Sequence, residues 1–145
     1  MRPSSGFTLV EILLTLGLVI SLVGLSAALG SQAVRHTEFD RVRESIRSEL
    51  TAARTDSIGG TLDSSWGVAF FPHAITRYRG TNYATRSTAE DRTLTFENAV
   101  LLSGAAEVTF TRPFGIPSAP ATIVASDGLR TASTTVNAIG TIDVL

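Results

Sequence analysis

An apolar run from Phe7 to about Gly30 constrains this chain more than any other feature, because it contains a single formal charge, Glu11. As a helix rising about 1.5 Å per residue, a run of this length crosses a hydrocarbon core of roughly 30 Å. An ionised acid well inside a bilayer costs about 2.5 to 3.5 kcal/mol unless a cation pairs with it. The run therefore predicts a membrane-inserted helix over residues 7–30 in which Glu11 has a specific role.

Two interpretations of Glu11 are open. Thr8 and Glu11 have the spacing of a capping box, in which a threonine hydroxyl and a glutamate satisfy free amides at a helix start. The acid is also favoured by the positive end of the helix dipole. Alternatively, cleavage between Gly6 and Phe7 would create an ammonium group four residues before Glu11, able to pair with the Glu11 of a neighbouring subunit inside the lipid. The carboxylate would then direct assembly.

The start of the chain carries a family resemblance. A short basic leader that ends in Gly6, followed by Phe7-Thr8-Leu9-Val10-Glu11 and a long apolar helix, resembles the class III signal of type IV pilins and type II secretion pseudopilins. The resemblance implies that a prepilin peptidase removes residues 1–6 at the cytoplasmic face of the inner membrane. It also implies N-methylation of the new Phe7 amine, and a role for Glu11 in setting the register during filament assembly.

A conventional secretory signal is the alternative for the same region, because Ser26-Ala27-Ala28 offers small residues at which a signal peptidase could cut. Its basic region would be thin, since only Arg2 and the amino terminus carry positive charge, and its apolar region would be long and would contain Glu11. The family signal keeps the helix in the mature protein. The secretory signal discards it and leaves an exported or membrane-tethered β-domain that binds a ligand.

Small residues recur along the apolar run at helical spacing. Gly17, Ser21, Gly24 and Ala28 share one helix face, where small side chains let a neighbouring helix approach closely in lipid. Glycine and serine are also common in membrane helices generally. We predict that this face packs against the helices of other subunits.

Beyond Gly30 the helical period continues on a more polar background. One apolar stripe with spacings of three and four residues consists of Phe39, Val42, Ile46, Leu50 and Ala53. The Gly59-Gly60 pair ends the helix, since glycine readily adopts the left-handed conformation of a C-terminal cap. Residues 31–58 are thus predicted to form an amphipathic helix whose stripe packs on a small domain. Its balanced charges are interpreted mainly as a solvated face, with salt bridges between subunits as the lesser alternative.

Residues 59–145 are predicted to form a β-rich domain. Alternating segments that predict strands are 66–70, 93–96, 108–111, 121–126, 129–136 and 141–144. Asp127-Gly128 predicts a two-residue hairpin turn, Gly80–Asp91 a polar loop and Pro113–Pro120 an irregular connection. The predicted fold class is therefore α+β: a long N-terminal helix, membrane-spanning in its first half and amphipathic in its second, packed on a small antiparallel β-sheet domain.

The order of these elements resembles, more weakly, the C-terminal domain of H-type minor pseudopilins and related minor pilins. The resemblance lies in a helix, a Trp66-Gly67-Val68 strand, a variable loop, and a stretch from Phe110 through Pro113-Phe114-Gly115 to the Asp127-Gly128 hairpin. Many major pilins close a C-terminal loop with a disulfide, whereas this chain has no cysteine. A minor pilin or pseudopilin is therefore favoured over a major pilin of that kind.

Nothing in the sequence indicates catalysis. The absence of cysteine excludes disulfides, thiolate metal sites and cysteine nucleophiles. His36 and His73 fall in different elements, and no P-loop, HExxH, nucleophile-elbow or dinucleotide-binding motif occurs. We expect no enzymatic activity, no cofactor and no metal site.

One segment interleaves arginine with tyrosine, a combination that binds phosphates and stacks bases of single-stranded nucleic acid. Its residues are Arg77, Tyr78, Arg79, Tyr83 and Arg86. The formal net charge of −1 gives the protein no global attraction for nucleic acid, and such alternation is ordinary on a solvent-facing strand. Nucleic-acid contact, as in an uptake minor pilin, is kept as an alternative.

The sequence as a whole predicts a minor structural subunit of a type IV pilus-like filament or of a type II secretion pseudopilus. The expected partners are a prepilin peptidase, other pilin or pseudopilin subunits through the N-terminal helix, and the inner membrane. The expected location is a single-pass inner-membrane protein with its C-terminal domain in the periplasm, and afterwards a periplasmic or cell-surface filament.

Overall fold

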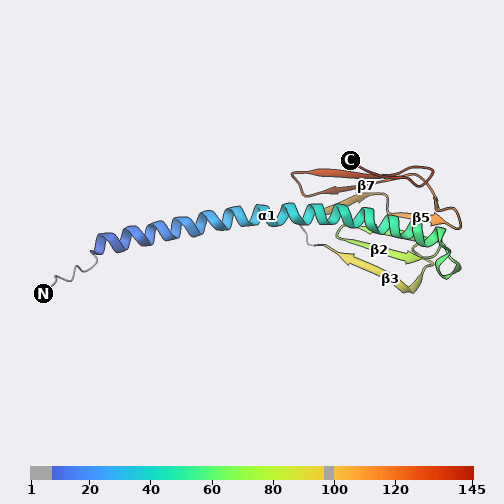
Figure 1. The fold of residues 1–145 in the computed structure, drawn as a ribbon, viewed down its shortest axis with the longest axis horizontal. Coiled ribbons are helices and arrows are strands. Elements are labelled where there is room, and N and C mark those ends of the chain that lie inside the picture. The colour runs from blue at the N-terminus through green and yellow to red at the C-terminus, as the bar shows by residue number, and fades with distance from the viewer. Residues whose placement is uncertain (1–7, 97–99) are drawn as a thin grey trace. The chain divides into compact units, whose positions relative to one another are not determined.

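The computed structural model describes residues 8–96 and 100–145, without the side chains of the helical stretch 25–36. The chain divides into two compact units, residues 1–36 and residues 37–145. One helix, α1 (Leu9–Ile58), supplies the described part of the first unit and enters the second. The second unit also contains a short 3-10 helix, η1 (Thr61–Asp63), and all the strands (Figure 1).

The strands of the predicted antiparallel β-sheet domain form two sheets, a division that the sequence did not indicate. The five-stranded sheet has the order β3-β2-β1-β5-β6, and the four-stranded sheet has the order β4-β7-β8-β9. The strands are β1 (Trp66–Phe71), β2 (Ala74–Arg79), β3 (Ser87–Thr95), β4 (Leu101–Gly104), β5 (Glu107–Thr111), β6 (Ile116–Pro117), β7 (Ala121–Ser126), β8 (Thr131–Val136) and β9 (Ile142–Val144). In the centre of the first sheet, Val68 of β1 pairs with Arg77 of β2 and with Val108 of β5.

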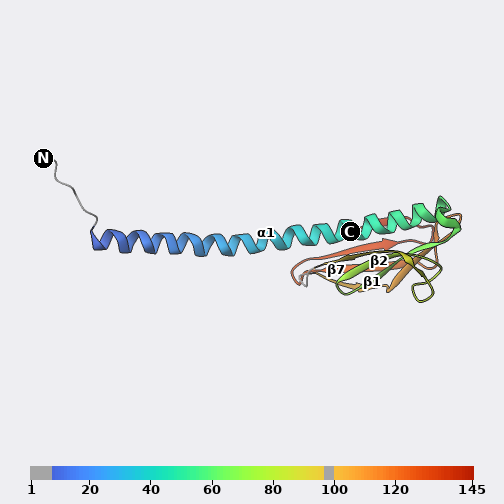
Figure 2. The ribbon, with the colours of Figure 1, turned by 90° about the horizontal axis from the view of Figure 1, so that it is seen from below.

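The C-terminal part of α1 covers both sheets. Figure 1 shows β2 and β3 on one side of the helix and β7 on the other, and the perpendicular view in Figure 2 shows the strands together beneath it. The predicted stripe from Phe39 to Ala53 is buried in full, against residues such as Phe110 of the first sheet and Ile123 of the second. Every member of this hydrophobic core lies within residues 37–145. Among the described residues, the hydrophobic core thus belongs to the second unit.

The predicted end of the helix is confirmed. The helix ends at Ile58, Gly60 has a φ of 66°, and the Gly59 N–H donates to the Thr55 carbonyl at 2.8 Å. One buried hydroxyl then joins this end to the first sheet: Ser57 Oγ lies 3.0 Å from the Phe110 carbonyl oxygen and accepts the Trp66 N–H at 2.9 Å.

The Asp127-Gly128 prediction was wrong in its turn type. Ser126 pairs with Thr131, so β7 and β8 are joined by four residues rather than two. Asp127 stabilises this longer turn, because its Oδ1 accepts the N–H groups of Leu129 and Arg130 at 2.9 and 2.7 Å. These hydrogen bonds, first of all the one from the Arg130 backbone, lower the pKa of the Asp127 carboxyl.

Two predicted loops also contain strands. β3 begins at Ser87, inside the expected loop Gly80–Asp91, and β6 lies inside the expected irregular connection Pro113–Pro120. Both are edge strands of the first sheet. An edge position tolerates the charges of β3 and the proline of β6, because one side of each strand needs no partner. The four-residue strand β4 was not predicted, because its sequence, Leu-Leu-Ser-Gly, does not alternate between apolar and polar residues.

A cluster of ions fixes α1 to the first sheet. Arg77 Nε of β2 lies 3.0 Å from Glu49 Oε2 of the helix, and Arg77 Nη1 also bonds to Asp56, about two helical turns further on. The Nε contact is an ion pair without hydrogen-bond geometry. Arg92 Nε of β3 lies 3.4 Å from the other carboxylate oxygen, Glu49 Oε1. Because Glu49 is only 4% exposed, it depends on these cations for compensation of its charge.

Replacing Arg77 with methionine should destabilise the second unit strongly. The variant keeps the bulk of the side chain but leaves Glu49 buried with a single, largely exposed cation, Arg92. We expect urea unfolding of residues 37–145 to show a loss of about 3 kcal/mol, at the low end of the range for breaking a buried ion pair. Arg92→Met should cost less than about 1 kcal/mol, and Glu49→Gln combined with Arg77→Met should recover part of the loss. Equal losses for the two arginine variants would show that burial of Glu49 is not the cause.

Candidate functional site

The start of α1 shows the threonine half of the predicted capping box. The Glu11 N–H donates to Thr8 Oγ1 at 3.3 Å, and the Ile12 N–H donates to the Thr8 carbonyl at 3.2 Å. Thr8 therefore satisfies amides that a helix start leaves free. The carboxylate of Glu11 has no bond among the described residues, so its role in assembly stays a prediction. The predicted processing residues Gly6 and Phe7 lie outside the described residues.

The first turns of α1 are apolar on every side. Every leucine, isoleucine and valine from Leu9 to Val23 is more than half exposed. A helix that is hydrophobic all round is normally buried, either in the core of a large protein or in a membrane. This segment of the helix therefore requires a covering that lies outside the described part of the chain.

The predicted small face forms a shallow groove on this helix. Leu14, Gly17, Leu18, Ser21 and Leu22 line a space of about 510 Å³. Ser21 Oγ donates to the Gly17 carbonyl at 2.9 Å, so its polar group is satisfied within the helix. Nothing lies within 4 Å of the position that a Cβ of Gly17 would occupy. The groove is thus open at Gly17, where a side chain would not meet any described residue.

The remaining members of the small face are described less completely. Around Gly24, as around Gly17, the space for a Cβ is open. Ala28 belongs to the stretch of helix whose side chains are not described. Packing of this face against other subunits remains a prediction.

Among the described residues, no helix has an apolar stretch long enough to cross a membrane. The predicted span, residues 7–30, includes Phe7 and the side chains of residues 25–30, which lie outside the described part.

The arginine–tyrosine segment is not the exposed patch that its sequence suggested, since Tyr78 is fully buried. Its hydroxyl donates to Glu107 Oε2 at 2.8 Å and lies 2.6 Å from Thr109 Oγ1. Burial raises the pKa of the Tyr78 phenol well above its ordinary value. A tyrosine in this position has no face available for stacking on a base.

The arginines of this segment are paired with acids of the same chain. Arg77 belongs to the ion cluster under α1, and Arg79 Nη1 lies 3.2 Å from Glu90 Oε1. Arg86 binds Asp91 at 2.8 Å and places its guanidinium 3.6 Å from the centre of the Tyr83 ring. A nucleic-acid phosphate would have to compete with these carboxylates for each arginine. The geometry therefore gives no support to nucleic-acid contact.

Two positions that shape this region were not singled out in the sequence. The ion pairing of Arg77 with acids of α1 could not be predicted from nearby residues, because its partner Asp56 lies 21 residues earlier in the chain. Gly67 could have been found, since an isolated glycine within a strand indicates a close approach of another group. A Cβ there would stand 2.6 Å from the Tyr78 ring and hydroxyl.

Comparison with known proteins found a similar fold among solved structures. No family model and no curated protein matches the chain. Among solved structures, the minor pseudopilin EpsH from the type 2 secretion system of Vibrio cholerae superposes with a TM-score of 0.57 at 14% sequence identity. The match covers 74% of this chain and 96% of that one. At this level of identity the likeness concerns the fold: an α+β domain of the kind found in a minor pseudopilin.

Proposed function

We propose that the protein is a pilin-like structural subunit that acts by polymerising, as a minor component of a type II secretion pseudopilus or of a type IV pilus-like filament. The observation that carries the proposal is the exposure of the apolar helix from Leu9 to Val23 around its whole circumference. Burial of one leucine, isoleucine or valine side chain contributes about 1.5 to 3 kcal/mol. This surface is therefore a strong driving force for insertion into lipid and for association with other helices.

The position of Glu11 fits this role better than a simple anchor. Thr8 Oγ1 accepts one of the free amides at the helix start, and no hydrogen bond of the Glu11 carboxylate occurs among the described residues. A charge among apolar side chains is stable only with a counter-ion. The amine of Phe7 in a neighbouring subunit, freed by removal of residues 1–6, would supply it. The pair would form only when the two helices reach the correct register, which makes Glu11 an assembly residue.

The second unit supplies the rest of the subunit. Its likeness in fold to EpsH supports a place among pseudopilin-like proteins, and the burial of the α1 stripe ties the globular core to the helix that polymerises. In this proposal the protein lies in the inner membrane with its domain in the periplasm, after cleavage and N-methylation by a prepilin peptidase. It then passes into the filament, with no catalytic step of its own.

The alternative is an exported β-domain that has lost its helix by cleavage near Ser26-Ala27-Ala28. The core members among the described residues all lie within residues 37–145 and would remain in such a product. The apolar helix would then serve for export alone.

The first residue of the mature protein distinguishes the pilin-like subunit from the exported β-domain. Mass spectrometry of the protein purified from its own host should show a chain that begins at Phe7 with one added methyl group. A chain that begins near Leu29 would contradict the proposal and support the exported domain.

Glu11→Gln should block assembly while leaving processing intact. The amide has the shape of the acid but no charge, so the ion pair with the Phe7 amine is lost in a low-dielectric environment. We expect at least about a tenfold drop in sheared filaments, equivalent to about 1.4 kcal/mol per subunit contact. Glu38→Gln, in the same helix but in the second unit, is the matched control and should assemble normally. Filament yields equal to wild type for Glu11→Gln would show that the carboxylate has no role in assembly.

Gly17→Leu should weaken helix packing, because the new side chain fills the groove between Leu14 and Ser21. Insertion into the membrane should be unchanged, since leucine is at least as apolar as glycine. The measurement is the ratio of filament to membrane-bound subunit, which we expect to fall several-fold. Thr15→Leu places the same side chain on the opposite face, although it adds less bulk, and should leave the ratio unchanged. A similar fall in both variants would indicate a general effect of bulk instead of a packing face.

A further inference from the structure

Exposed apolar side chains gather in the second unit where α1 ends. Ile58, the last residue of the helix, is 50% exposed, and Phe114 and Ile139 are 73% and 69% exposed. Ile116 of β6 is 45% exposed. Solitary apolar residues are normal on a protein surface, whereas a cluster of them marks a contact. We call these four residues the end patch.

One arginine holds the three parts of the end patch together. Arg54 of α1 donates from Nε to the Gly115 carbonyl at 3.3 Å and from Nη2 to the Ile139 carbonyl at 3.2 Å. A Cβ on Gly115 would stand 2.7 Å from Ile58 Cγ1, and a Cβ on Gly140 would stand 2.7 Å from the Gly115 oxygen. The end of α1, the β5–β6 turn and the β8–β9 turn therefore lie against one another, and their apolar side chains form one surface.

Both turns are held by hydrogen bonds of their own, so the end patch is a fixed surface. In the β5–β6 turn, the Gly115 N–H donates to the Thr111 carbonyl at 2.8 Å, and Thr111 Oγ1 donates to the Ile116 carbonyl at 3.0 Å. In the β8–β9 turn, the Ile139 N–H donates to Asn137 Oδ1 at 3.1 Å. A surface that is ordered before it binds loses little conformational entropy on binding.

A further apolar residue beside the end patch is held in an unfavourable conformation. Leu62 of η1 is 56% exposed and has a φ of 52°, a left-handed value that leucine rarely adopts. The η1 turn lies next to the β5–β6 turn, because Asp63 forms an ion pair with Arg112. Neither backbone conformation nor hydration favours leucine here, and residues held in such conformations cluster at functional sites. Leu62 therefore borders the end patch as a candidate contact of the same partner.

The size of the end patch indicates what can cover it. At about 200 Å² for a fully exposed large apolar residue, the four exposed fractions correspond to roughly 500 Å². The largest apolar patch of a typical monomer measures about 300–600 Å², whereas a standard stable complex buries about 800 Å² on each partner. The end patch is therefore too small to hold a freely diffusing protein. It suffices for a protein that a second contact already keeps close.

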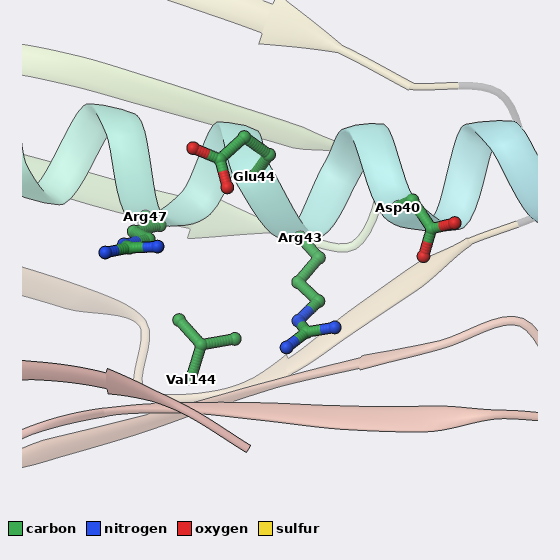
Figure 3. A pocket seen from close by; sticks show the side chains of 5 residues that line it. All are labelled: Asp40, Arg43, Glu44, Arg47 and Val144. Atoms are coloured by element: carbon green, nitrogen blue, oxygen red, sulfur yellow. The ribbon is translucent and has the colours of Figure 1, made fainter.

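The side of α1 that faces β9 offers a different kind of surface. Figure 3 shows a groove of about 310 Å³ between the helix and Val144, lined otherwise by the charged side chains of Asp40, Arg43, Glu44 and Arg47. These acids and arginines stand at the i,i+3 spacing at which opposite charges compensate each other within one helix. The charges of this groove are therefore balanced within the chain, whereas the apolar end patch is left uncovered.

We propose that the end patch binds the globular domain of a different pilin-like subunit of the same filament. The inference rests on the proposed function, in which the packed helices of the two subunits provide the second contact. About 30 Å of helix separates Ile58 from Thr37, where α1 enters the unit, so the partner is a protein and not the bilayer that holds the start of the helix. A second copy does not fit, because patch-to-patch contact would make the two helices antiparallel, whereas subunits inserted into one membrane run parallel.

Photocrosslinking identifies the partner. A full-length chain with p-benzoylphenylalanine in place of Phe114, expressed in the native host, should yield an adduct when sheared filaments are irradiated. The second protein in the adduct should be a different chain that carries its own pilin-type signal. The same group in place of Leu129, an 88% exposed residue of the β7–β8 turn, should yield at least about fivefold less of this adduct. An adduct with a second copy of this chain or with lipid, or none in intact filaments, would overturn the proposal.

Removal of the apolar side chains tests the contact itself. Phe114→Gln combined with Ile139→Gln should lower the fraction of this subunit in sheared filaments at least about tenfold, equivalent to about 1.4 kcal/mol. Phe114→Leu keeps an apolar side chain and should lower the fraction less than about twofold. Leu129→Gln removes an exposed leucine outside the end patch and should leave the fraction unchanged. Normal incorporation of the double variant would overturn the proposal.

Leu62→Asn separates binding from folding. Asparagine adopts the left-handed conformation more readily than leucine, so the urea midpoint of this variant should equal or exceed that of wild type. Its incorporation into filaments should nevertheless fall about threefold, because the apolar side chain is lost. A lower urea midpoint with normal incorporation would show that Leu62 serves the fold and would overturn its role in the contact.

The two levels of the proposal fail differently. Filaments whose subunits begin at Phe7 but whose Phe114 crosslinker forms no adduct with another pilin-like subunit overturn this contact and leave the proposed function standing. A wild-type chain whose mature form does not begin at Phe7 overturns the proposed function, and the contact with it.

Discussion

Burial of one helical stripe under two sheets is the constraint on which the second unit depends. The residues from Phe39 to Ala53 form a wall of the core for both sheets at once, so neither sheet has a closed core without the helix. Two further contacts set the position of the helix: Ser57 joins its end to Trp66 and Phe110, and Glu49 joins its middle to Arg77. Residues 37–58 of the helix are thereby an integral part of the second unit.

The same constraint explains why the arginine–tyrosine segment does not form a binding surface. β2 lies next to the centre of the five-stranded sheet, beneath the helix, so alternate side chains of this strand turn toward the core. Arg77 reaches acids of α1 from there, and Tyr78, on the other face, is covered by the close approach over Gly67. A pattern that in isolation is typical of phosphate binding serves here to neutralise buried acids.

Local patterns in the sequence predicted local structure, but they did not predict which distant segments of the chain pair with one another. The stripe of α1, its end at Gly59-Gly60, the cap at Thr8 and the bounds of β7 follow from spacing and side-chain chemistry within a few residues. The division into two sheets, the short β4 and the partners of Arg77 depend on segments far apart in the chain. The turn at Asp127 failed for another reason: the carboxylate of Asp127 binds two backbone amides and so favours a longer turn than the pair of residues suggested.

The outer edge strand β3 has a consequence for a protein that is proposed to pack among other subunits of a filament. Open strand edges recruit strands from other molecules, and the usual protection is charge along the edge. β3 carries Glu90, Asp91 and Arg92 in succession, each held in an ion pair with a neighbouring element of its own chain. A second sheet that docked there would have to break these pairs and bury their charges. Fusion of sheets between adjacent domains is thereby discouraged, in agreement with the proposal that subunits associate through their helices.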